Sequence, residues 1–215
     1  MVEPRRHEAE LLELEAALSG HGLSAVHTAA FVAHFRLLLR WNPTHNLTRI
    51  LSPREAAVLH YLDSVFPLLA APPPPSLCDV GSGAGFPGLV AAVLWPSTEV
   101  VLVEPARKRA SFLQIAASEL GLKNVRVTGP SRVSTHARVL SRATFSAGAR
   151  HELWAYVAPG GSLWAWTTHH DRSTWEREAA TWLPSSTEWV PYRLPSPAEG
   201  VELAHGLLRL HRASD

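Results

Sequence analysis

Asp79-Val-Gly-Ser-Gly-Ala-Gly-Phe-Pro-Gly88 is the most informative run of residues in this 215-residue chain. The mostly apolar run Leu77–Val80 leads into it and predicts a buried strand, while the residues from about Phe86 to Leu94 predict an apolar helix. Glycine lets a backbone turn tightly or approach a ligand without a Cβ in the way. A glycine-rich turn between a strand and a helix is typical of sites that bind a nucleotide-like ligand.

Strands and helices alternate along the chain after this loop. The expected strands lie near residues 99–104, 124–128, 137–141 and 162–166. The expected helices lie near 107–120, 144–157 and 173–183, and strands near 187–193 and 204–211 are expected to pair as a hairpin. This alternation predicts an α/β fold, with a doubly wound and mostly parallel sheet that ends in a C-terminal antiparallel hairpin.

The residues before the loop predict helices. Leu11, Leu14 and Leu18 recur at helical spacing, and Ser24 is expected to cap a second helix. That second helix should end near Trp41-Asn42, because the next residue is proline, which disfavours helical geometry in the residue before it.

A third helix and a linker complete this N-terminal part. Ser52-Pro53-Arg54-Glu55 predicts a helix start with Ser52 as cap, and the helix should continue through Leu59 and Leu62 towards residue 67. Four consecutive prolines at 72–75 form a stiff spacer that cannot be helical. We therefore expect an N-terminal helical extension at 1–71 and a second domain at 72–215.

Composition excludes several classes of protein. Hydrophobic residues make up 46% of the chain, enough to bury a core, yet the longest unbroken apolar stretch is Leu89–Trp95, too short for a membrane helix. A single cysteine, Cys78, excludes an internal disulfide framework and a Cys-rich zinc site. His169-His170-Asp171 lacks a partner triad for a metal. We expect a cytoplasmic protein without a metal or a membrane partner.

Positive charge is concentrated in one part of the chain. The net charge is +1, but residues 99–150 contain nine Lys or Arg and only three acids. Arg107, Lys108 and Arg109 stand at a predicted helix N-terminus, where positive charge opposes the helix dipole. This cluster indicates contact with phosphate, RNA being the first candidate, although an ordinary solvated surface would carry the same charges.

Two classes of ligand fit the glycine loop. Gly83-x-Gly85-x-x-Gly88, followed by Glu104, matches a dinucleotide fingerprint. The alternative pattern, Asp79-x-Gly81-x-Gly83-x-Gly85, matches the loop that binds S-adenosyl-L-methionine (AdoMet). We favour AdoMet, because an acidic residue suits a cationic ligand and little chain remains after residue 130 for a dehydrogenase substrate domain. The carboxylate at position 104 is placed to accept hydrogen bonds from ribose hydroxyls.

Two catalytic features that the chain lacks narrow the range of possible methyl acceptors. Amino-group methylation usually relies on an Asn/Asp-Pro-Pro-aromatic motif after the fourth strand, where this chain has Ser141-Arg142-Ala143. Methylation of a pyrimidine carbon needs a cysteine nucleophile, but Cys78 lies in the first predicted strand. Guanine N7 carries a lone pair and no proton, so positioning suffices and no general base is required.

Several blocks of sequence resemble the RsmG family (glucose-inhibited division protein B), bacterial enzymes that methylate a guanine N7 in small-subunit ribosomal RNA. The blocks are Trp41-Asn42 with Asn46-Leu47-Thr48; His60-Tyr61-Leu62-Asp63-Ser64; the loop at 79–88; and Glu104 with 108–113. Ser141-Arg142-Ala143 and the turn at 159–161 extend the similarity, which covers about residues 10–166. The resemblance implies a class I Rossmann-like methyltransferase, with AdoMet as cofactor and the 30S subunit or its RNA as partner. We expect a monomer.

The resemblance also implies roles for individual residues. The expected cofactor-binding residues are Asp79, Gly81, Gly83, Gly85, Phe86, Glu104, Val133, Ser134 and Arg142, of which Val133 and Ser134 flank the adenine. Arg142 is the expected catalytic residue, at the junction of cofactor and acceptor. The expected RNA-binding residues are Arg107, Lys108, Arg109, Asn46 and His60. Asn46, His60 and Asp63 are expected where the helical extension meets the second domain, although His60 and Asp63 would also fit a purely structural hydrogen bond.

The chain departs from the family pattern at three places. Ser134 replaces a usual acidic residue, only six residues separate it from Ser141, and Thr167-Thr168 replaces a usual lysine. Three other functions therefore stay open at this point: an RNA- or ribosome-associated protein without catalysis, a methyltransferase for a small molecule, and a nicotinamide oxidoreductase.

Overall fold

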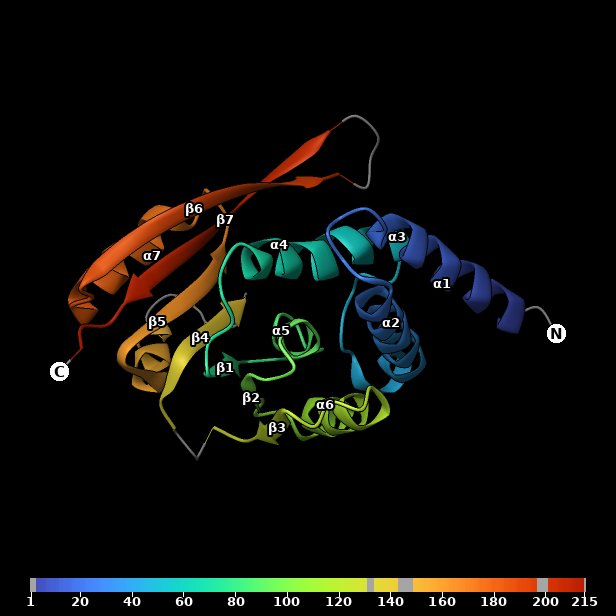
Figure 1. Ribbon diagram of the computed structural model, residues 1–215, viewed down its shortest axis with the longest axis horizontal. Helices are drawn as coiled ribbons and strands as arrows, with labels where there is room; N and C mark the ends of the chain where they lie inside the picture. The colour runs from blue at the N-terminus through green and yellow to red at the C-terminus, as the bar shows by residue number, and fades with distance from the viewer. Residues whose placement is uncertain (1–2, 131–133, 143–148, 197–200, 215) are drawn as a thin grey trace.

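A seven-stranded sheet forms the centre of the protein, as the computed structural model shows for residues 3–130, 134–142, 149–196 and 201–214 (Figure 1). The strands are β1 (Ser76–Val80), β2 (Glu99–Val103), β3 (Val125–Thr128), β4 (His136–Arg142), β5 (Val157–Thr167), β6 (Ser186–Pro195) and β7 (Glu202–His211). Their order is β3-β2-β1-β4-β5-β7-β6. The first five are parallel, whereas β7 runs antiparallel to both β5 and β6. The predicted α/β sheet and its terminal hairpin are confirmed.

Helices lie on both faces of the sheet. One face carries α1 (Glu3–Leu18), α2 (Ala25–His45), α3 (Pro53–Ala56), η1 (Ala57–Leu62), α4 (Asp63–Leu69), α5 (Gly88–Leu94) and α6 (Arg107–Glu119). The other carries η2 (Arg150–Tyr156) and α7 (Arg172–Ala179), which continues into η3 (Ala180–Trp182). Leu77 and Cys78, neighbours in β1, belong to these two separate cores, because successive side chains of a strand point to opposite faces.

The second helix is longer than the sequence predicts. Ser24 accepts a hydrogen bond from the backbone of His27, so the predicted cap is confirmed. The predicted end at Trp41-Asn42 is wrong, because α2 continues through Pro43 to His45. Proline costs one backbone donor here, but the Asn42 side chain accepts from the amides of Leu47 and Thr48 at 2.8 and 2.9 Å. These bonds hold the turn that follows the helix.

The helical run from α3 to α4 contains a π-helical segment. Its start at Pro53 is confirmed, but the Ser52 side chain makes no capping hydrogen bond. Six residues, Ala57–Leu62, form η1 with π-helical geometry, and α4 then continues through Pro67. π-Helical turns are frequent at functional sites because they reorient side chains. This segment presents His60 to the glycine loop.

The predicted helix over 144–157 is not an α-helix in its described part. Residues 143–148 lie outside the described structure, and Arg150–Tyr156 form a 3-10 helix. β5 also begins earlier than predicted, at Val157, and includes the Pro-Gly-Gly turn. Residues 129, 130, 134 and 135, the described part of the β3–β4 connection, are not helical.

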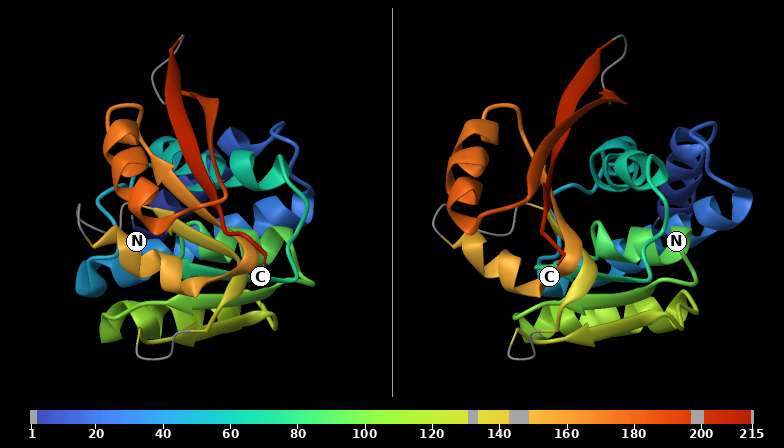
Figure 2. Two further views of the ribbon diagram at one scale, coloured as in Figure 1. Left: turned by 90° about the vertical axis from the view of Figure 1, so that its left-hand side faces the viewer. Right: turned by 60° about the vertical axis from the view of Figure 1, so that its left-hand side comes forward.

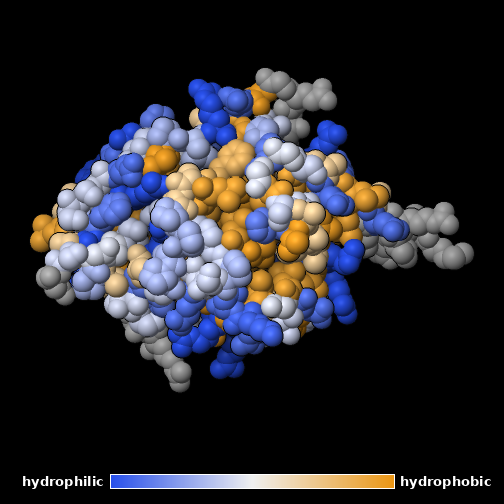
Figure 3. Space-filling view, in the orientation of Figure 1, coloured by the Kyte–Doolittle hydropathy of each residue, from blue (hydrophilic) through white to orange (hydrophobic). Residues whose placement is uncertain are grey.

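The hairpin β6–β7 lies between α4 on one side and α7 on the other (Figure 2). It therefore touches both the N-terminal helices and the far face of the sheet. On the face seen in Figure 3, hydrophobic residues gather over α4 and α5. The division of the chain into 1–71 and 72–215 stays a prediction. In the described residues, no helix is long and apolar enough to cross a membrane.

Candidate active site

The glycine loop follows β1 and is fixed to β2 by its backbone. The amides of Gly81 and Ser82 donate to the carbonyl of Val103, at 2.8 and 3.2 Å. Gly81, Gly83 and Gly85 have φ angles of 79°, 55° and 96°. Such angles strain residues that carry a side chain, so the loop needs glycine at these positions. The loop lies where the strand order turns from β1–β2 to β1–β4, the usual ligand position in open α/β sheets.

Asp79 lies at the end of β1, where the glycine loop begins. Its side chain is fully buried, and Oδ2 accepts a hydrogen bond from the amide of Gly88 at 2.9 Å. Oδ1 has no hydrogen-bond partner in the described structure. Burial raises the pKa of this carboxyl to about 7. Asp79 therefore positions the start of α5, and its predicted role in binding the cofactor stays a prediction.

Glu104 joins the loop to the start of α6. Its carboxylate is buried and accepts hydrogen bonds from the amides of Gly83 and Ala106, both at 2.9 Å. Each oxygen keeps a further lone pair, since a carboxylate has about four acceptor sites. A hydrogen bond to a ribose stays a prediction for this residue.

A cavity of about 320 Å³ lies between the glycine loop and the N-terminal helices. Its lining comes from three parts of the chain: the connection after α2, the η1 segment and the loop, with one residue from the end of β4. These residues are Leu47, Thr48, Ile50, Leu59, His60, Gly81, Ser82, Gly83, Ala84, Phe86 and Arg142. Its volume is in the range of small-molecule sites. The structure thus brings together five of the predicted site residues: Gly81, Gly83, Phe86, His60 and Arg142.

His60 is buried against the loop. Its ring stacks on Phe86, with centroids 4.5 Å apart and planes at 13°, and its Nε2 is 2.9 Å from the Thr48 hydroxyl. Burial, together with the nearby charge of Arg142, lowers the pKa of His60 to about 3. The imidazole is therefore neutral at physiological pH. Its predicted contact with RNA remains untested, but little of its surface is free for one.

Arg142 binds the N-terminal helices to the sheet. Its Nη1 donates to Asp63 Oδ2 at 3.1 Å and to the carbonyls of Leu59 and His60 at 3.2 and 3.3 Å. The guanidinium also lies over the Phe86 ring, 5.3 Å from its centroid. Arg142 is thus held between η1, α4 and the glycine loop, and its predicted role between cofactor and acceptor stays a prediction.

Asp63 is the centre of a wider network. Its Oδ1 accepts from the hydroxyl of Tyr192 at 2.6 Å and lies 2.8 Å from Nδ1 of His205. Burial raises the pKa of Asp63, but the contacts with His205 and Arg142 outweigh it, so the pKa lies below its usual value. The same hydrogen bond raises the pKa of His205. The network joins α4, β4 and the hairpin.

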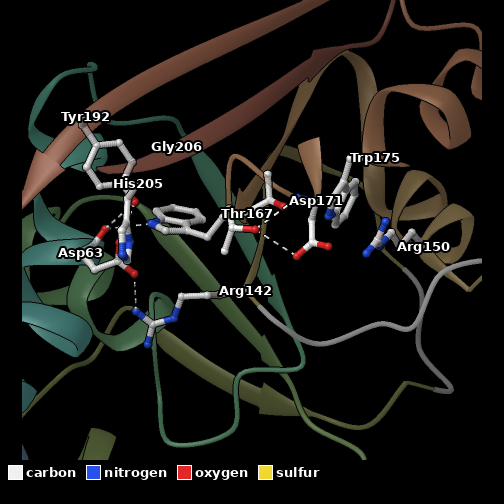
Figure 4. Close-up of a pocket in the computed structure, with 11 residues that line it drawn as sticks. Asp63, Arg142, Arg150, Thr167, Asp171, Trp175, Tyr192, His205 and Gly206 are labelled. Atoms are coloured by element: carbon white, nitrogen blue, oxygen red, sulfur yellow. Dashed lines mark hydrogen bonds and ion pairs between the residues drawn. The ribbon is translucent and has the colours of Figure 1, made fainter. Parts of the chain in front are cut away.

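A second cavity, of about 230 Å³, lies on the other side of Arg142 (Figure 4). Asp63, Tyr192 and His205 stand at one end, and Trp175 and Arg150 at the other. Four residues of this lining were not predicted from the sequence as site residues: Tyr192, His205, Trp175 and Arg150. They carry no local motif, and Tyr192 and His205 lie more than a hundred residues from Asp63.

The residues predicted for RNA contact are mostly exposed. Arg107, Lys108 and Arg109 form the exposed first turn of α6, and Lys108 Nζ donates to the carbonyl of Thr44 at 3.4 Å. Asn46, two residues further along, ends α2 in a left-handed conformation with φ 49° and is also exposed. The contact of Lys108 with Thr44 places the exposed start of α6 beside the end of α2.

Ser134, one of the two predicted adenine contacts, is not in the lining of the cavity beside the loop. Val133 lies outside the described residues, and the exposed Ser134 has its hydroxyl 2.8 Å from His136 Nε2. Gly85 is not in the lining either, because a Cβ there would meet the side chain of Leu89. Across the described parts of the chain, no cluster of three potential metal ligands occurs.

Similar solved structures share the fold. A cofactor-bound protein from MTB superimposes with a TM-score of 0.59 at 15% identity, covering 91% of this chain and 94% of that one. A SAM-dependent O-methyltransferase from Thermotoga maritima gives a TM-score of 0.55 at 15% identity, covering 85% and 72%. At these identities the likeness concerns the fold alone, which is that of Rossmann-like methyltransferases.

Proteins similar in sequence identify the family more specifically than the similar structures do. A ribosomal RNA small subunit methyltransferase G from Solibacter usitatus is 46% identical over 99 residues, 46% of this chain and 47% of that protein. One from Streptococcus pyogenes is 42% identical over 109 residues, 49% of this chain and 46% of that protein. The chain spans about half the length of these curated relatives. The sequence profile of GidB, rRNA small subunit methyltransferase G, matches residues 27–188. The chain therefore belongs to the GidB family of rRNA small subunit methyltransferase G.

Proposed function

We propose that this protein transfers a methyl group from AdoMet to N7 of a guanine in small-subunit ribosomal RNA. The observation that carries the proposal is the cavity of about 320 Å³ whose floor is the glycine loop and whose far side is Arg142. Family membership supports the reaction class. The residues that line the cavity support the roles proposed below for binding the cofactor and aligning the acceptor.

The loop fits a ligand that approaches backbone closely. A Cβ built at Gly83 meets no atom nearer than the carbonyl oxygen of Gly81, at 3.8 Å, so it would extend into the cavity rather than into protein. Backbone without side chains is what a nucleoside ligand needs at this edge of the sheet. Gly81, Gly83 and Phe86 would hold AdoMet, with Glu104 fixing the loop from below. When bound, AdoMet supplies an electrophilic methyl group on a sulfonium.

The lining contains no group suited to remove a proton near neutral pH. His60 has a pKa of about 3, which makes it a poor base, and Arg142 is a cation bonded to Asp63. Guanine N7 has a free lone pair and no proton to lose, so it needs no such base. The task left to the protein is to align the acceptor and exclude water. Arg142, which lines both cavities, is placed to do this between cofactor and acceptor.

The exposed basic rim supports an RNA acceptor. Arg36 and Arg40 are exposed on α2, the helix that packs against α6. Together with Arg107, Lys108 and Arg109 they form a basic rim on α2 and α6, which would bind phosphates without sequence preference.

Label transfer tests the proposal. Purified protein is incubated with AdoMet carrying a labelled methyl group and with 30S subunits, or their RNA, that lack the modification. We expect label in the RNA and 7-methylguanosine after digestion. AdoMet binding without transfer to any RNA would favour a non-catalytic protein, and transfer only to small molecules would contradict the RNA acceptor.

A further inference from the structure

The cavity of about 230 Å³ beyond Arg142 has no role in the steps described so far. Arg142 ends β4, while Trp166 and Thr167 end β5, so this cavity lies at the carboxyl ends of two parallel strands. Ligands of open α/β sheets bind at these ends. Because Arg142 lines both cavities, the second adjoins the first on the side away from the glycine loop.

Arg150 is a buried cation with spare donors in this cavity. The residue is only 9% exposed, and its guanidinium carbon lies 4.4 Å from the centroid of the Trp175 ring. Its Nε and Nη1 are buried and make no hydrogen bond in the described structure. Glu178 forms an ion pair with it, with Oε1 3.6 Å from Nη1, a distance too long for a hydrogen bond. A buried guanidinium with unused donors is costly unless a ligand oxyanion takes them.

We propose that this cavity binds the phosphate group of the acceptor nucleotide and that Arg150 donates to it. The inference rests on the proposed function. A guanidinium presents donors in a planar fork that matches two phosphate oxygens. Two other polar groups of the lining are already engaged: Arg142 donates to Asp63, and the Thr168 hydroxyl donates to Asp171 at 3.1 Å.

This position would direct the base towards the methyl donor. Arg150 lies at the end of the cavity opposite Asp63 and Tyr192 (Figure 4), so a phosphate bound to it would lie at that end. The attached base would then extend along the cavity past Arg142, towards the glycine loop. Arg150 is thus a substrate-binding residue, and Trp175 positions it by packing against the guanidinium face.

The test compares ligands with and without phosphate. Protein saturated with adenosylhomocysteine is titrated with guanosine 5′-monophosphate, guanosine and inorganic phosphate at constant ionic strength, followed by tryptophan fluorescence. We expect the monophosphate to bind about tenfold or more tightly than guanosine. Arg150→Gln should abolish this difference, whereas Arg150→Lys should retain part of it, and adenosylhomocysteine affinity should be unchanged in both.

Two neighbouring positions serve as controls. Glu178→Gln removes the competing carboxylate and should tighten binding of the monophosphate and of inorganic phosphate, which keeps the test valid if Arg150→Gln fails to fold. Arg177→Gln removes an exposed positive charge from the same helix and should change nothing. Binding of guanosine by itself, without a contribution from phosphate, would overturn the inference.

The outcomes separate this inference from the proposed function. Equal affinity of wild type and Arg150→Gln for the monophosphate overturns the phosphate site, whatever the protein does to 30S subunits. A loss of adenosylhomocysteine affinity in Arg150→Gln, with the phosphate preference intact, would assign Arg150 to the cofactor instead. A normal phosphate preference without label transfer to RNA leaves this site in place and contradicts the proposed methylation alone.

Discussion

Gly83 and Gly121 have similar backbone conformations and different surroundings. Their φ angles are +55° and +65°, but a Cβ at Gly83 would extend into the glycine-loop cavity, whereas one at Gly121 meets nothing within 4 Å. Comparing substitutions at these two glycines therefore separates the cost of backbone strain from the effect of filling ligand space. A left-handed alanine costs about 1–2 kcal/mol at either position.

Gly83→Ala should weaken adenosylhomocysteine binding by about tenfold or more, because the methyl group occupies ligand space. Calorimetry measures the affinity, and thermal unfolding measures the loss of stability. Gly121→Ala should lose a similar amount of stability and bind the ligand normally. Equal affinities in the two variants would mean that the ligand does not lie over Gly83.

Asp79→Asn should change how stability depends on pH. The folded-state pKa of about 7 lies above the ordinary value of 3.8, so the folded protein takes up this proton more readily than the unfolded chain. The resulting stabilisation is complete below pH 3.8 and is lost as the pH rises towards 7, by at most about 4 kcal/mol. Asparagine cannot ionise. Urea unfolding at pH 5 and pH 8 should therefore show the variant gaining stability relative to wild type as the pH rises, and a constant difference would contradict the raised pKa.

At the scale of elements, the Asp63 carboxylate connects α4, β4 and the hairpin. Asp63→Asn should destabilise the protein by about 3 kcal/mol, because Arg142 and His205 lose the charge that compensates them in a mostly buried setting. Denaturant unfolding measures this. Glu202→Gln is the matched control on the same hairpin, since its pair with Arg193 is exposed and should contribute less than about 1 kcal/mol. Similar losses of unfolding free energy in both variants would show that the Asp63 network stabilises the protein no more than an exposed ion pair does.

The local sequence pattern predicted most of the helices and strands but few of the contacts between them. Glycine and proline spacing located β1, the loop and α5, since backbone conformation there depends on neighbouring residues. The end of α2 was predicted wrongly, because Asn42 compensates for Pro43 through side-chain hydrogen bonds that no propensity describes. The contacts of Asp63 with Tyr192 and His205 depend on how the hairpin docks, which is a property of tertiary packing.

Some site residues could be predicted from a local motif, whereas others depend on tertiary packing. Gly81, Gly83 and Phe86 follow from a contiguous motif, and the structure places them around one cavity. Arg150 belongs to a 3-10 helix without a motif, so its burial against Trp175 was not predictable from sequence. The roles of the predicted cofactor-binding and RNA-binding residues stay predictions, which measurements of AdoMet and RNA binding test.

For the whole molecule, the basic rim on α2 and α6 determines how RNA binding responds to salt. Replacing Arg107, Lys108 and Arg109 with glutamine should weaken RNA binding and reduce the slope of log affinity against log salt by up to about 2, since each phosphate contact in a single strand contributes about 0.7. Adenosylhomocysteine affinity should not change. Filter binding at several salt concentrations measures the slope.

The control removes the same number of charges elsewhere. Lys123, Arg177 and Arg193 are exposed on other parts of the surface, and their replacement by glutamine should leave the slope nearly unchanged. An equal reduction in both triple variants would mean that RNA responds to net charge and has no preferred face.

The docked hairpin also bears on how changes in the gene are interpreted. The family profile ends at residue 188, whereas Tyr192 and His205 lie beyond it and donate to Asp63. A premature stop codon just past position 190 would preserve the diagnostic family signature. It would nevertheless remove β7 and both of these donors, so a truncated reading frame could score as an intact family member while lacking the support behind Arg142.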